Sequence, residues 1–435
     1  MKYFSLNHNA KDVNFLETVR KGLAPDRGLY FPKEIPLLEE NFIANINQYS
    51  DHEIAFKVIQ PFVGKDIPKN RLKKIVAETL NFDFPIVEIT DNIAALELFQ
   101  GPTLAFKDVG ARFMARCLSY ANELEQKEKL TILVATSGDT GGAVADGFYK
   151  VKGVDVVILY PKGKVSDIQE RQLTTLGENI TALEIDGTFD DCQDMVKSAF
   201  IDAELIQSVA LTSANSINIA RWLSQMFYYF IAYKNRPNPD KKLVISVPSG
   251  NYGNICAGLM AQKMGLPIFH FIASTNVNNT VPEYLKSGDY NPKKSTQTIS
   301  NAMDVGDPSN FIRIQKIFNN DFFKLKKQLS GFSYSDKHTQ KALKEIFSQS
   351  NYIADPHGAV GFLGLKEFFE TQQDTSNYQG LFLETAHPIK FVDAVEHILK
   401  TKVNVPERLK SILKRKKLSS EIREYSELKS FLLSR

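Results

Sequence analysis

The stretch Leu130-Thr-Ile-Leu-Val-Ala135, which runs directly into Thr136-Ser-Gly-Asp-Thr-Gly-Gly142, decides the fold. An apolar run this short and rich in branched side chains predicts a strand buried on both faces. The residues from 142 to 150 then follow a helical spacing. A strand, a glycine-rich loop and a helix in this order form the first half of a βαβ unit. The stretch therefore predicts a parallel sheet with helices packed against it.

The same alternation continues on the C-terminal side of this stretch. Apolar runs that predict strands are 154–160, 180–185, 242–247 and 267–273, and the helical spacings between them are 167–176, 190–200 and 252–264. Strands that alternate with helices indicate an α/β fold with doubly wound, mostly parallel sheets. No internal repeat and no low-complexity segment interrupts the pattern.

The length of 435 residues exceeds a single compact core and predicts more than one domain. We expect an N-terminal domain over 1–98, with helices at 52–63 and 70–79. A catalytic region over 99–400 would contain two α/β subdomains, interleaved in sequence, around 100–240 and 241–400. Within it, 274–310 reads as polar loop and the C-terminal third as mostly helical. Residues 401–435 read as a basic helical tail, with ten Lys and Arg against four Glu.

Composition disfavours several classes of protein. The formal net charge is +3, too small to make nucleic-acid or membrane binding the default expectation. Cys117, Cys192 and Cys256 lie far apart without a C-x-x-C pair, which argues against a disulfide framework and a structural zinc site. No apolar run reaches the roughly 18 residues that a membrane span needs. We therefore expect a soluble cytoplasmic protein that binds no metal, no nucleic acid and no membrane.

A single lysine is the first candidate catalytic residue. Lys107 lies in Gly101-Pro-Thr-Leu-Ala-Phe-Lys107-Asp-Val-Gly-Ala-Arg-Phe-Met-Ala-Arg116, directly after three apolar residues and before a helix. Burial would lower the pKa of this lysine, and a neutral amine is what carbonyl chemistry requires. Taken alone, the segment fits a solvated surface lysine near a helix start better than a catalytic one, because lysine is rarely buried.

A second glycine-rich loop follows the strand predicted at 242–247. Pro248-Ser-Gly-Asn-Tyr-Gly-Asn254 again leads into a helix, so two loops in the chain present free backbone N–H groups to an anion. Neither loop matches G-x-G-x-x-G, and no G-x-x-x-x-G-K-[ST] motif is present, which disfavours an NAD or ATP enzyme. A reactive lysine with two anion-binding loops suggests pyridoxal phosphate as the cofactor.

Four motifs in a fixed order resemble threonine synthases, within the tryptophan-synthase-β class (fold type II) of pyridoxal phosphate enzymes. They are Phe106-Lys-Asp108, Thr136–Gly142, Pro248–Asn254 and Glu384-Thr-Ala-His-Pro388. The segments Gly22–Pro32, Ala273–Pro282 and Ser300–Asp304 are similar to the longer form of that family. The resemblance covers nearly the whole chain.

The resemblance implies a cofactor site. Lys107 would form the Schiff base with pyridoxal phosphate, and Thr385 would bind the pyridine nitrogen. Asp139 would face the ring hydroxyl of the cofactor, although many relatives outside the family have Asn there. The cofactor phosphate would lie against Gly250, Asn251, Tyr252, Gly253 and Asn254.

The resemblance also implies O-phospho-L-homoserine as the substrate. Its carboxylate would meet Ser137, Gly138 and Thr140, and its phosphate would meet Asn215, Asn218 and Arg221. Arg221 fits a surface salt bridge equally well, and the two asparagines fit caps of the following helix. His357 and His387 are assigned no catalytic role.

The implied reaction is γ-elimination of phosphate followed by addition of water at Cβ, which gives L-threonine. A threonine-synthase-like phospholyase and a threonine or serine dehydratase are alternatives with the same cofactor. A non-catalytic scaffold that binds pyridoxal phosphate is an alternative from another class. We expect a monomer or a homodimer.

Overall fold

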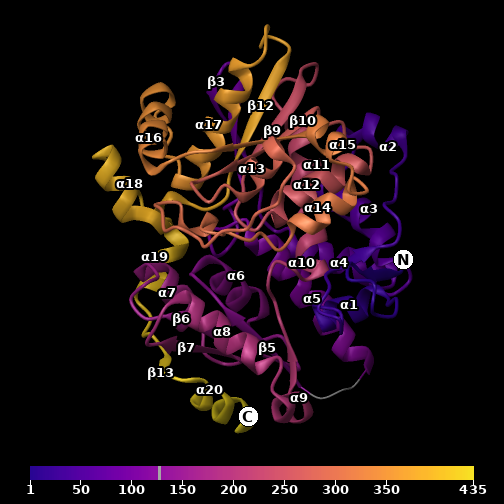
Figure 1. Cartoon of the computed structure of the whole chain (residues 1–435), viewed down its shortest axis with the longest axis vertical. Coiled ribbons are helices and arrows are strands. Elements are labelled where there is room, and N and C mark those ends of the chain that lie inside the picture. Colours follow the sequence, from indigo (N-terminus) through magenta and orange to yellow (C-terminus); the bar gives the residue numbers. More distant parts are fainter. Residues whose placement is uncertain (126–128) are drawn as a thin grey trace.

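The computed structural model describes residues 1–125 and 129–435. A five-stranded sheet with the order β13-β7-β6-β5-β8 lies in the lower part of Figure 1, and a six-stranded sheet with the order β11-β10-β9-β12-β4-β3 lies in the upper part. Both sheets are covered by helices. The predicted doubly wound α/β fold is confirmed.

The five-stranded sheet is entirely parallel. Its strands are β5 (Leu130–Ala135), β6 (Val154–Pro161), β7 (Ile180–Ile185), β8 (Ala210–Thr212) and β13 (Ser419–Ile422). Side chains on β5 alternate between two cores, as the period of a strand requires. Ile132 and Val134 join the core with α5 (Lys107–Glu125) and α6 (Asp139–Phe148), while Leu133 joins α8 (Phe189–Ala199) and α20 (Tyr425–Leu433).

The six-stranded sheet is parallel except where β3 meets β4. Its strands are β3 (Ile86–Thr90), β4 (Ile93–Glu97), β9 (Lys242–Pro248), β10 (His270–Thr275), β11 (Leu329–Ser333) and β12 (Tyr378–Glu384). Ile245 on β9 packs into the core that contains α12 (Gly253–Lys263), while its neighbour Val244 packs on the side of α17 (Pro356–Glu370). Burial on both faces explains why these strands are continuously apolar.

An N-terminal unit lies on the right of Figure 1 and packs against α5. It consists of the antiparallel pair β1 (Tyr3–Ser5) and β2 (Tyr30–Pro32) with α1 (Phe15–Lys21), α2 (Glu40–Ala44), α3 (Asp51–Val63) and α4 (Lys69–Thr79). The unit also supports a distant segment of the chain. Thr212 Oγ1 donates to the Arg20 carbonyl at 2.6 Å, and Asn218 Nδ2 donates to the Val19 carbonyl at 2.9 Å.

The remaining helices connect or flank the sheets. They are α7 (Asp167–Thr174), α9 (Ala203–Ser208), α10 (Ile219–Leu223), α11 (Met226–Asn235), α13 (Thr280–Ser287), α14 (Phe311–Ile317), α15 (Phe322–Gln328), α16 (Asp336–Ser350), α18 (Val392–Leu399), α19 (Glu407–Leu413) and the 3₁₀ turns η1 (Ile46–Gln48), η2 (Asn301–Met303) and η3 (Pro388–Phe391). Within the described parts of the chain, no helix has both the length and the apolar character needed to cross a membrane.

The structure differs from the expected domain organisation in four places. β3 and β4, expected within an N-terminal domain over 1–98, pair in the six-stranded sheet with strands from 242–384. The tail over 401–435 adds β13 to the edge of the other sheet, beside β7. β11 and β12 lie in the part expected to be mostly helical, and α13 lies in the segment 274–310 expected to be loop. Short strands that pair with distant partners leave little local signal, which explains three of these differences.

Candidate active site

Three segments that are far apart in sequence meet because β4, β12 and β9 are parallel neighbours. The carboxyl ends of parallel strands lie at one edge of a sheet, where ligands bind in open α/β folds. The segment after β4 leads to Lys107, the segment after β12 begins with Thr385, and the segment after β9 contains Gly250. The first two are joined directly, since Phe106 N donates to the Thr385 carbonyl at 2.9 Å. The fold therefore gathers three of the predicted site segments.

Lys107 is the first residue of α5 and is partly exposed. Burial is the largest cause that lowers the pKa of Lys107 to about 8; Asp139 opposes this shift, and Arg221 and Lys390 reinforce it. Among the described residues, no acid forms an ion pair with this amine. At neutral pH, a pKa near 8 leaves a useful fraction of the amine neutral and nucleophilic.

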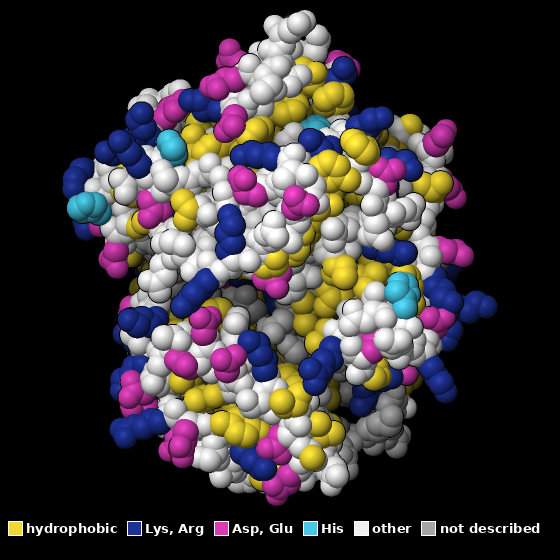
Figure 2. All heavy atoms as spheres, viewed as in Figure 1, with side chains coloured by type: hydrophobic (Ala, Val, Ile, Leu, Met, Phe, Trp, Pro, Cys, Tyr) yellow, Lys and Arg dark blue, Asp and Glu magenta, His cyan; other side chains and the backbone are white. Residues whose placement is uncertain are grey.

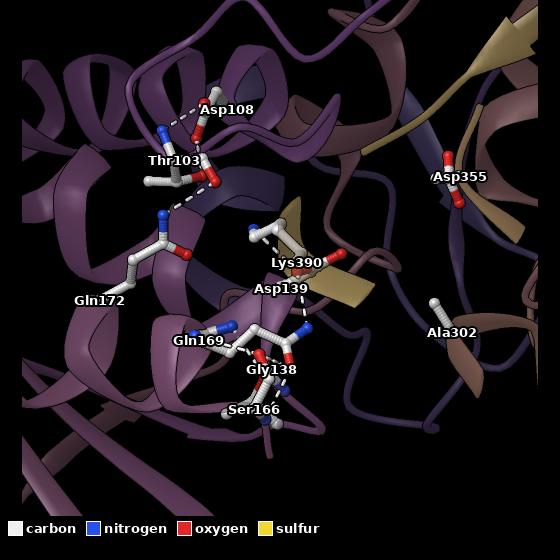
Figure 3. A network of polar contacts seen from close by, with 12 residues as sticks. Thr103, Asp108, Gly138, Asp139, Ser166, Gln169, Gln172, Ala302, Asp355 and Lys390 are labelled. Carbon is white, nitrogen blue, oxygen red and sulfur yellow. Dashed lines mark hydrogen bonds and ion pairs between the residues drawn. The ribbon is translucent and has the colours of Figure 1, made fainter. Parts of the chain in front are cut away.

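The start of α5 is held by a buried acid next to Lys107. Asp108 accepts hydrogen bonds from Thr103 N at 2.9 Å and from Thr103 Oγ1 at 2.5 Å. Gln172 Nε2 in turn donates to the Thr103 carbonyl at 3.0 Å (Figure 3). Burial raises the pKa of Asp108 to about 6. These contacts fix the backbone from which the Lys107 side chain extends.

The loop between β9 and α12 forms a tight backbone cradle. A Cβ on Gly250 would lie 2.7 Å from Met303 Cα, so only glycine fits this close approach. Tyr252 adopts a left-handed conformation, with φ 59°, at the N-cap of α12. Asn254 is held by Tyr228 and Tyr229, whose hydroxyls donate to its Oδ1 at 2.8 and 2.6 Å, while its buried Nδ2 has no partner among the described residues. An unpaired donor beside the free N–H groups of a helix start fits a bound phosphate.

The remaining predicted cofactor-binding residues lie in or near this cradle. Asn251 Nδ2 donates to Ser216 Oγ at 2.7 Å, and Asn251 Oδ1 accepts from Ser309 N at 2.6 Å. Gly253 is the first residue of α12. Thr385 is 8 % exposed and directly follows β12. β12 pairs in parallel with β4, the strand after which the chain leads to Lys107. The residues present therefore fit the phosphate of pyridoxal phosphate, and Thr385 lies on the segment joined to that of Lys107.

The loop between β5 and α6 belongs to the other sheet. Thr136 Oγ1 shapes it by accepting from Gly138 N at 3.0 Å and from Gly141 N at 2.8 Å. Gly138 has φ 131°, and a Cβ there would lie 2.5 Å from the Gln169 side chain. Ser137 and Thr140 are partly exposed in this loop, beside Gly138 and Asp139. Sequence reasoning did not single out Thr136, whose hydroxyl is the internal support of the loop.

Asp139 pairs with a lysine that sequence reasoning missed. Lys390 Nζ, from η3, lies 2.7 Å from Asp139 Oδ1, and Gln169 Nε2 donates to the same oxygen at 3.0 Å (Figure 3). Burial alone would raise the pKa of Asp139, but Lys390 and Lys107 outweigh it and hold this pKa well below its usual range. Asp139 is therefore an ionised carboxylate. Lys390 left no sequence signal, because a lysine in a Pro-Ile-Lys-Phe segment resembles a surface residue.

The candidate residues for the substrate phosphate have different environments. Arg221, in α10, is 2 % exposed and makes no ion pair with a described residue; its Nη1 donates to the Ala214 carbonyl at 2.5 Å and its buried Nε has no partner. The alternative of a surface salt bridge is therefore wrong. Asn218 caps α10, because its Oδ1 accepts from Ala220 N at 3.0 Å while its Nδ2 is bonded to Val19. Asn215 is partly exposed in the turn before it.

A buried acid network lies behind Thr385. His357 Nε2 accepts from Ala302 N at 3.1 Å, so its Nδ1 carries the proton and donates to Asp355 Oδ1 at 2.5 Å. Asp355 N donates to Glu384 Oε2 at 3.2 Å. Burial and then the Asp355 charge raise the pKa of Glu384 well above its usual range. The network connects Ala302, next to the Gly250 cradle, to Glu384 at the end of β12. The role of His357 is therefore structural.

The site lies between the two sheets. In Figure 2 the surface is hollowed near the centre of the view, close to the place where Figure 1 draws α6. In this region the cations Lys107 and Lys390 face the ionised Asp139, while Arg221 acts on Lys107 and is itself influenced by the acid Asp108. The excess of positive charge indicates a site for anionic ligands.

Comparison with known proteins first defines the class. Residues 89–377 match the family of pyridoxal-phosphate dependent enzymes. This range contains Lys107 and both glycine-rich loops. Residues 2–80 match the threonine synthase N terminus, and residues 358–432 match the threonine synthase C-terminal family.

Individual relatives agree over the full length. The chain is 46 % identical to threonine synthase from Buchnera aphidicola subsp. Baizongia pistaciae, with all of both chains covered. Its structure matches threonine synthase from Escherichia coli with a TM-score of 0.91 at 40 % identity, covering all of both chains. It matches PLP-bound threonine synthase from Brucella melitensis with a TM-score of 0.93 at 34 % identity, covering all of this chain and 99 % of the other. The chain belongs to the threonine synthase family.

Proposed function

We propose that the protein converts O-phospho-L-homoserine and water into L-threonine and phosphate. The observation that carries this proposal is Arg221, a buried guanidinium near Lys107 that forms no ion pair with a described residue, although the charge of Asp108 acts on it. A buried charge without a partner is costly, and a guanidinium matches a phosphate group in shape and charge. Because the cradle at Gly250 suits the phosphate of the cofactor, Arg221 provides for a second phosphate.

The cofactor, when bound, withdraws electrons from the amino acid substrate. The hydrogens on Cα and Cβ of the substrate become acidic as a result. Lys107 then moves the protons. With a pKa of about 8, roughly one Lys107 amine in ten is neutral at pH 7, against roughly one in 3,000 at the usual lysine pKa. Its Nζ can take the proton from Cα and later return it.

The remaining residues bind and orient. The N–H groups at the start of α6, with Ser137, Gly138 and Thr140, would hold the substrate carboxylate, since a helix N-terminus favours an anion. Arg221 with Asn215 would hold the substrate phosphate. Asn218 would act through the cap that it provides to α10, which holds Arg221 in place. The net reaction breaks the bond between Cγ and the phosphate oxygen and one Cβ–H bond. It forms a Cγ–H bond and a bond between Cβ and the oxygen of water, whose second proton leaves with the phosphate.

Product analysis tests the proposal. Purified protein with pyridoxal phosphate should convert O-phospho-L-homoserine into equal amounts of threonine and phosphate. Phosphate with 2-oxobutyrate would show a phospholyase instead, and no product from protein that binds the cofactor would overturn the substrate assignment. Lys107→Ala should lose at least about 10³-fold in turnover while remaining folded. Lys402→Met, which removes an exposed lysine paired with Glu396, is the matched control and should keep full activity.

Arg221 can be tested separately. Arg221→Met removes the guanidinium but keeps an apolar side chain in its buried place. We expect kcat/KM for O-phospho-L-homoserine to fall about 100-fold or more, because a charge-assisted contact to phosphate is lost. Binding of pyridoxal phosphate should change little. An equal loss of cofactor affinity would assign Arg221 to the cofactor phosphate instead.

We also propose that the protein works in the cytoplasm. Its three cysteines are free and buried, which suits a reducing compartment.

A further inference from the structure

Lys390 is an almost completely buried lysine of the site. It is 1 % exposed, and its Nζ makes no well-aligned hydrogen bond with the described residues, although it forms the ion pair with Asp139. Lysine is rarely buried to this extent, because the ammonium loses its hydration. The position of Lys390 therefore calls for a reason beyond packing.

The ion pair joins the two sheets across the site. Asp139 follows β5 of the five-stranded sheet, whereas Lys390 follows β12 of the six-stranded sheet. Figure 3 shows the Lys390 side chain extending from the segment after β12 towards the start of α6. Lys107, which starts from the segment after β4, is the other lysine whose charge lowers the pKa of Asp139. Two lysines thus face the same carboxylate from neighbouring strand ends.

The carboxylate is held on one side only. Asp139 Oδ1 is contacted by Lys390 and by Gln169, and Gln169 is itself fixed because its Oε1 accepts from Ser166 N at 3.1 Å. No hydrogen bond to Asp139 Oδ2 comes from the described residues. Without Lys390, the carboxylate would be free to turn towards Lys107, and a direct ion pair there would keep the Lys107 amine protonated.

We propose that Lys390 is a positioning residue that withholds the Asp139 carboxylate from Lys107, so that the Lys107 amine stays available to react. Lys390 acts in two ways: it binds Oδ1 and so fixes the carboxylate, and its charge disfavours a proton on Lys107. The inference rests on the proposed function, because it concerns the same lysine.

The charges that act on the two lysines come from several elements. Lys107 is influenced by Asp139 from α6, by Arg221 from α10 and by Lys390 from η3. The charge of Lys390 also acts on Asp108 from α5 and on His387, which precedes η3. Of these groups, Asp139 is the acid that raises the pKa of Lys107. A change at Lys390 should therefore reach Lys107 mainly through Asp139.

The test measures how fast pyridoxal phosphate joins Lys107 in the cofactor-free protein, followed by visible absorbance from about pH 6 to about pH 10. Only the neutral amine reacts, so the rate rises with pH and its midpoint reports the state of Lys107. Wild type should have a midpoint near 8. Lys390→Met should move the midpoint up by about one pH unit and slow the reaction at pH 7 by about tenfold. Lys390→Arg should remain close to wild type.

The double variant Lys390→Met/Asp139→Asn separates the proposal from a purely structural role. With the carboxylate also gone, the negative charge that stabilises the protonated Lys107 amine is lost, so the midpoint should return to the wild-type value or fall below it. Lys402→Met should leave the midpoint unchanged. An unchanged midpoint in Lys390→Met, or an upward shift that persists in the double variant, would overturn the proposal.

Two safeguards keep the outcome decisive. If Lys390→Met does not fold, Asp139→Asn alone must lower the midpoint, and an upward shift in that variant would overturn the proposal. The assay uses no substrate, so its failure is distinct from failure of the proposed reaction. Wild-type protein that makes threonine while Lys390→Met keeps the wild-type midpoint would refute the role of Lys390 and leave the function intact.

Discussion

The two glycine-rich loops have the same local design but different surroundings. Each follows a buried parallel strand and leads into a helix, and each needs glycine at a crowded point: Gly138 against Gln169 and Gly250 against Met303. The loop after β5 carries the ionised Asp139 and is tied by an ion pair to the other sheet. The loop after β9 carries uncharged side chains. It is held by hydrogen bonds between neutral groups, such as the one that its own Asn251 donates to Ser216.

The comparison shows that what packs behind a loop decides its chemistry. A neutral, fixed cradle suits a phosphate that stays bound through many turnovers, whereas a charged loop between two sheets suits a substrate that enters and leaves. Four changes to the protein test this division of labour, from the largest expected effect to the smallest.

Gly250→Ala should damage the neutral loop most. The added Cβ would lie 2.7 Å from Met303 Cα and 2.9 Å from the Ala302 carbonyl oxygen, neither of which can move easily. Overpacking of about 1–3 kcal/mol weakens cofactor binding by about 5- to 150-fold. Titration of the cofactor-free variant with pyridoxal phosphate measures this, and its melting temperature without cofactor shows whether it is folded. Undiminished cofactor affinity would remove Gly250 from the cradle.

Gly138→Ala should damage the charged loop and spare the cofactor. The Cβ would collide with Gln169, which orients Asp139, so kcat/KM should fall about 10-fold or more while cofactor affinity stays within about threefold. Gly265→Ala is the matched control, because Gly265 also has a positive φ, 108°, but no atom lies within 4 Å of its Cβ position. Equal effects on cofactor and substrate would contradict the division between the loops.

Asp139→Asn should shift the pH dependence of Lys107, whereas a change in the neutral loop should not. Asp139 raises the pKa of Lys107, so without its charge the midpoint for cofactor association should fall below the wild-type value of about 8. The rate at pH 7 then rises a few-fold, up to about threefold for half a pH unit. Asn251→Ala is the comparison: its rate can change, but its midpoint should stay at the wild-type value.

Glu384→Gln tests whether the support of the neutral loop is itself uncharged. The raised pKa of Glu384 means that the folded protein keeps a proton that the unfolded chain releases above about pH 4.5. Wild type therefore loses stability as the pH rises, by at most about 1.4 kcal/mol per pH unit, and Glu384→Gln should not. The measurement is the melting temperature of the variant minus that of wild type. This difference should be a few degrees larger at about pH 8 than at about pH 5.

Glu396 provides the opposite sign as a control. Its pKa is lowered, chiefly by Lys402, so it stabilises the fold above its unfolded pKa, and Glu396→Gln should be relatively less stable at the higher pH. A Glu384→Gln variant with the same trend as Glu396→Gln would mean that Glu384 is charged in the fold.

Sequence patterns predicted the parts of the structure that depend on local order. The strand at 130–135 was predicted at its observed bounds, and the helix observed at Gly253–Lys263 was predicted as 252–264. The anion-binding design of both loops also follows from short motifs. These features need only neighbouring residues, so one sequence is sufficient to predict them.

The features that sequence patterns missed depend on distant partners. β4 and β12 pair with each other although most of the chain separates them, and their pairing is what places Lys107 beside Thr385. Lys390 becomes part of the site only because β12 carries it to Asp139. The burial of Arg221 depends on α5, where a Cβ on Gly110 would lie 2.8 Å from the Arg221 carbonyl oxygen. No local pattern contains this information.

The six-stranded sheet is built from two separate parts of the sequence, β3–β4 and β9–β12, and this has a consequence for biosynthesis. β4 leaves the ribosome early, but both its parallel neighbour β12 and the next strand, β9, lie beyond the whole 130–212 part of the other sheet. At about 5–20 residues per second, β4 waits on the order of half a minute for β12. During this time the apolar strand Ile93-Ala-Ala-Leu-Glu97 is paired on one edge only, with β3, while the five-stranded sheet can already form except for β13. The order of synthesis thus completes the catalytic edge of the six-stranded sheet only after the strands at 130–212 have been made, and until then the free edge of β4 is open to pairing with another chain.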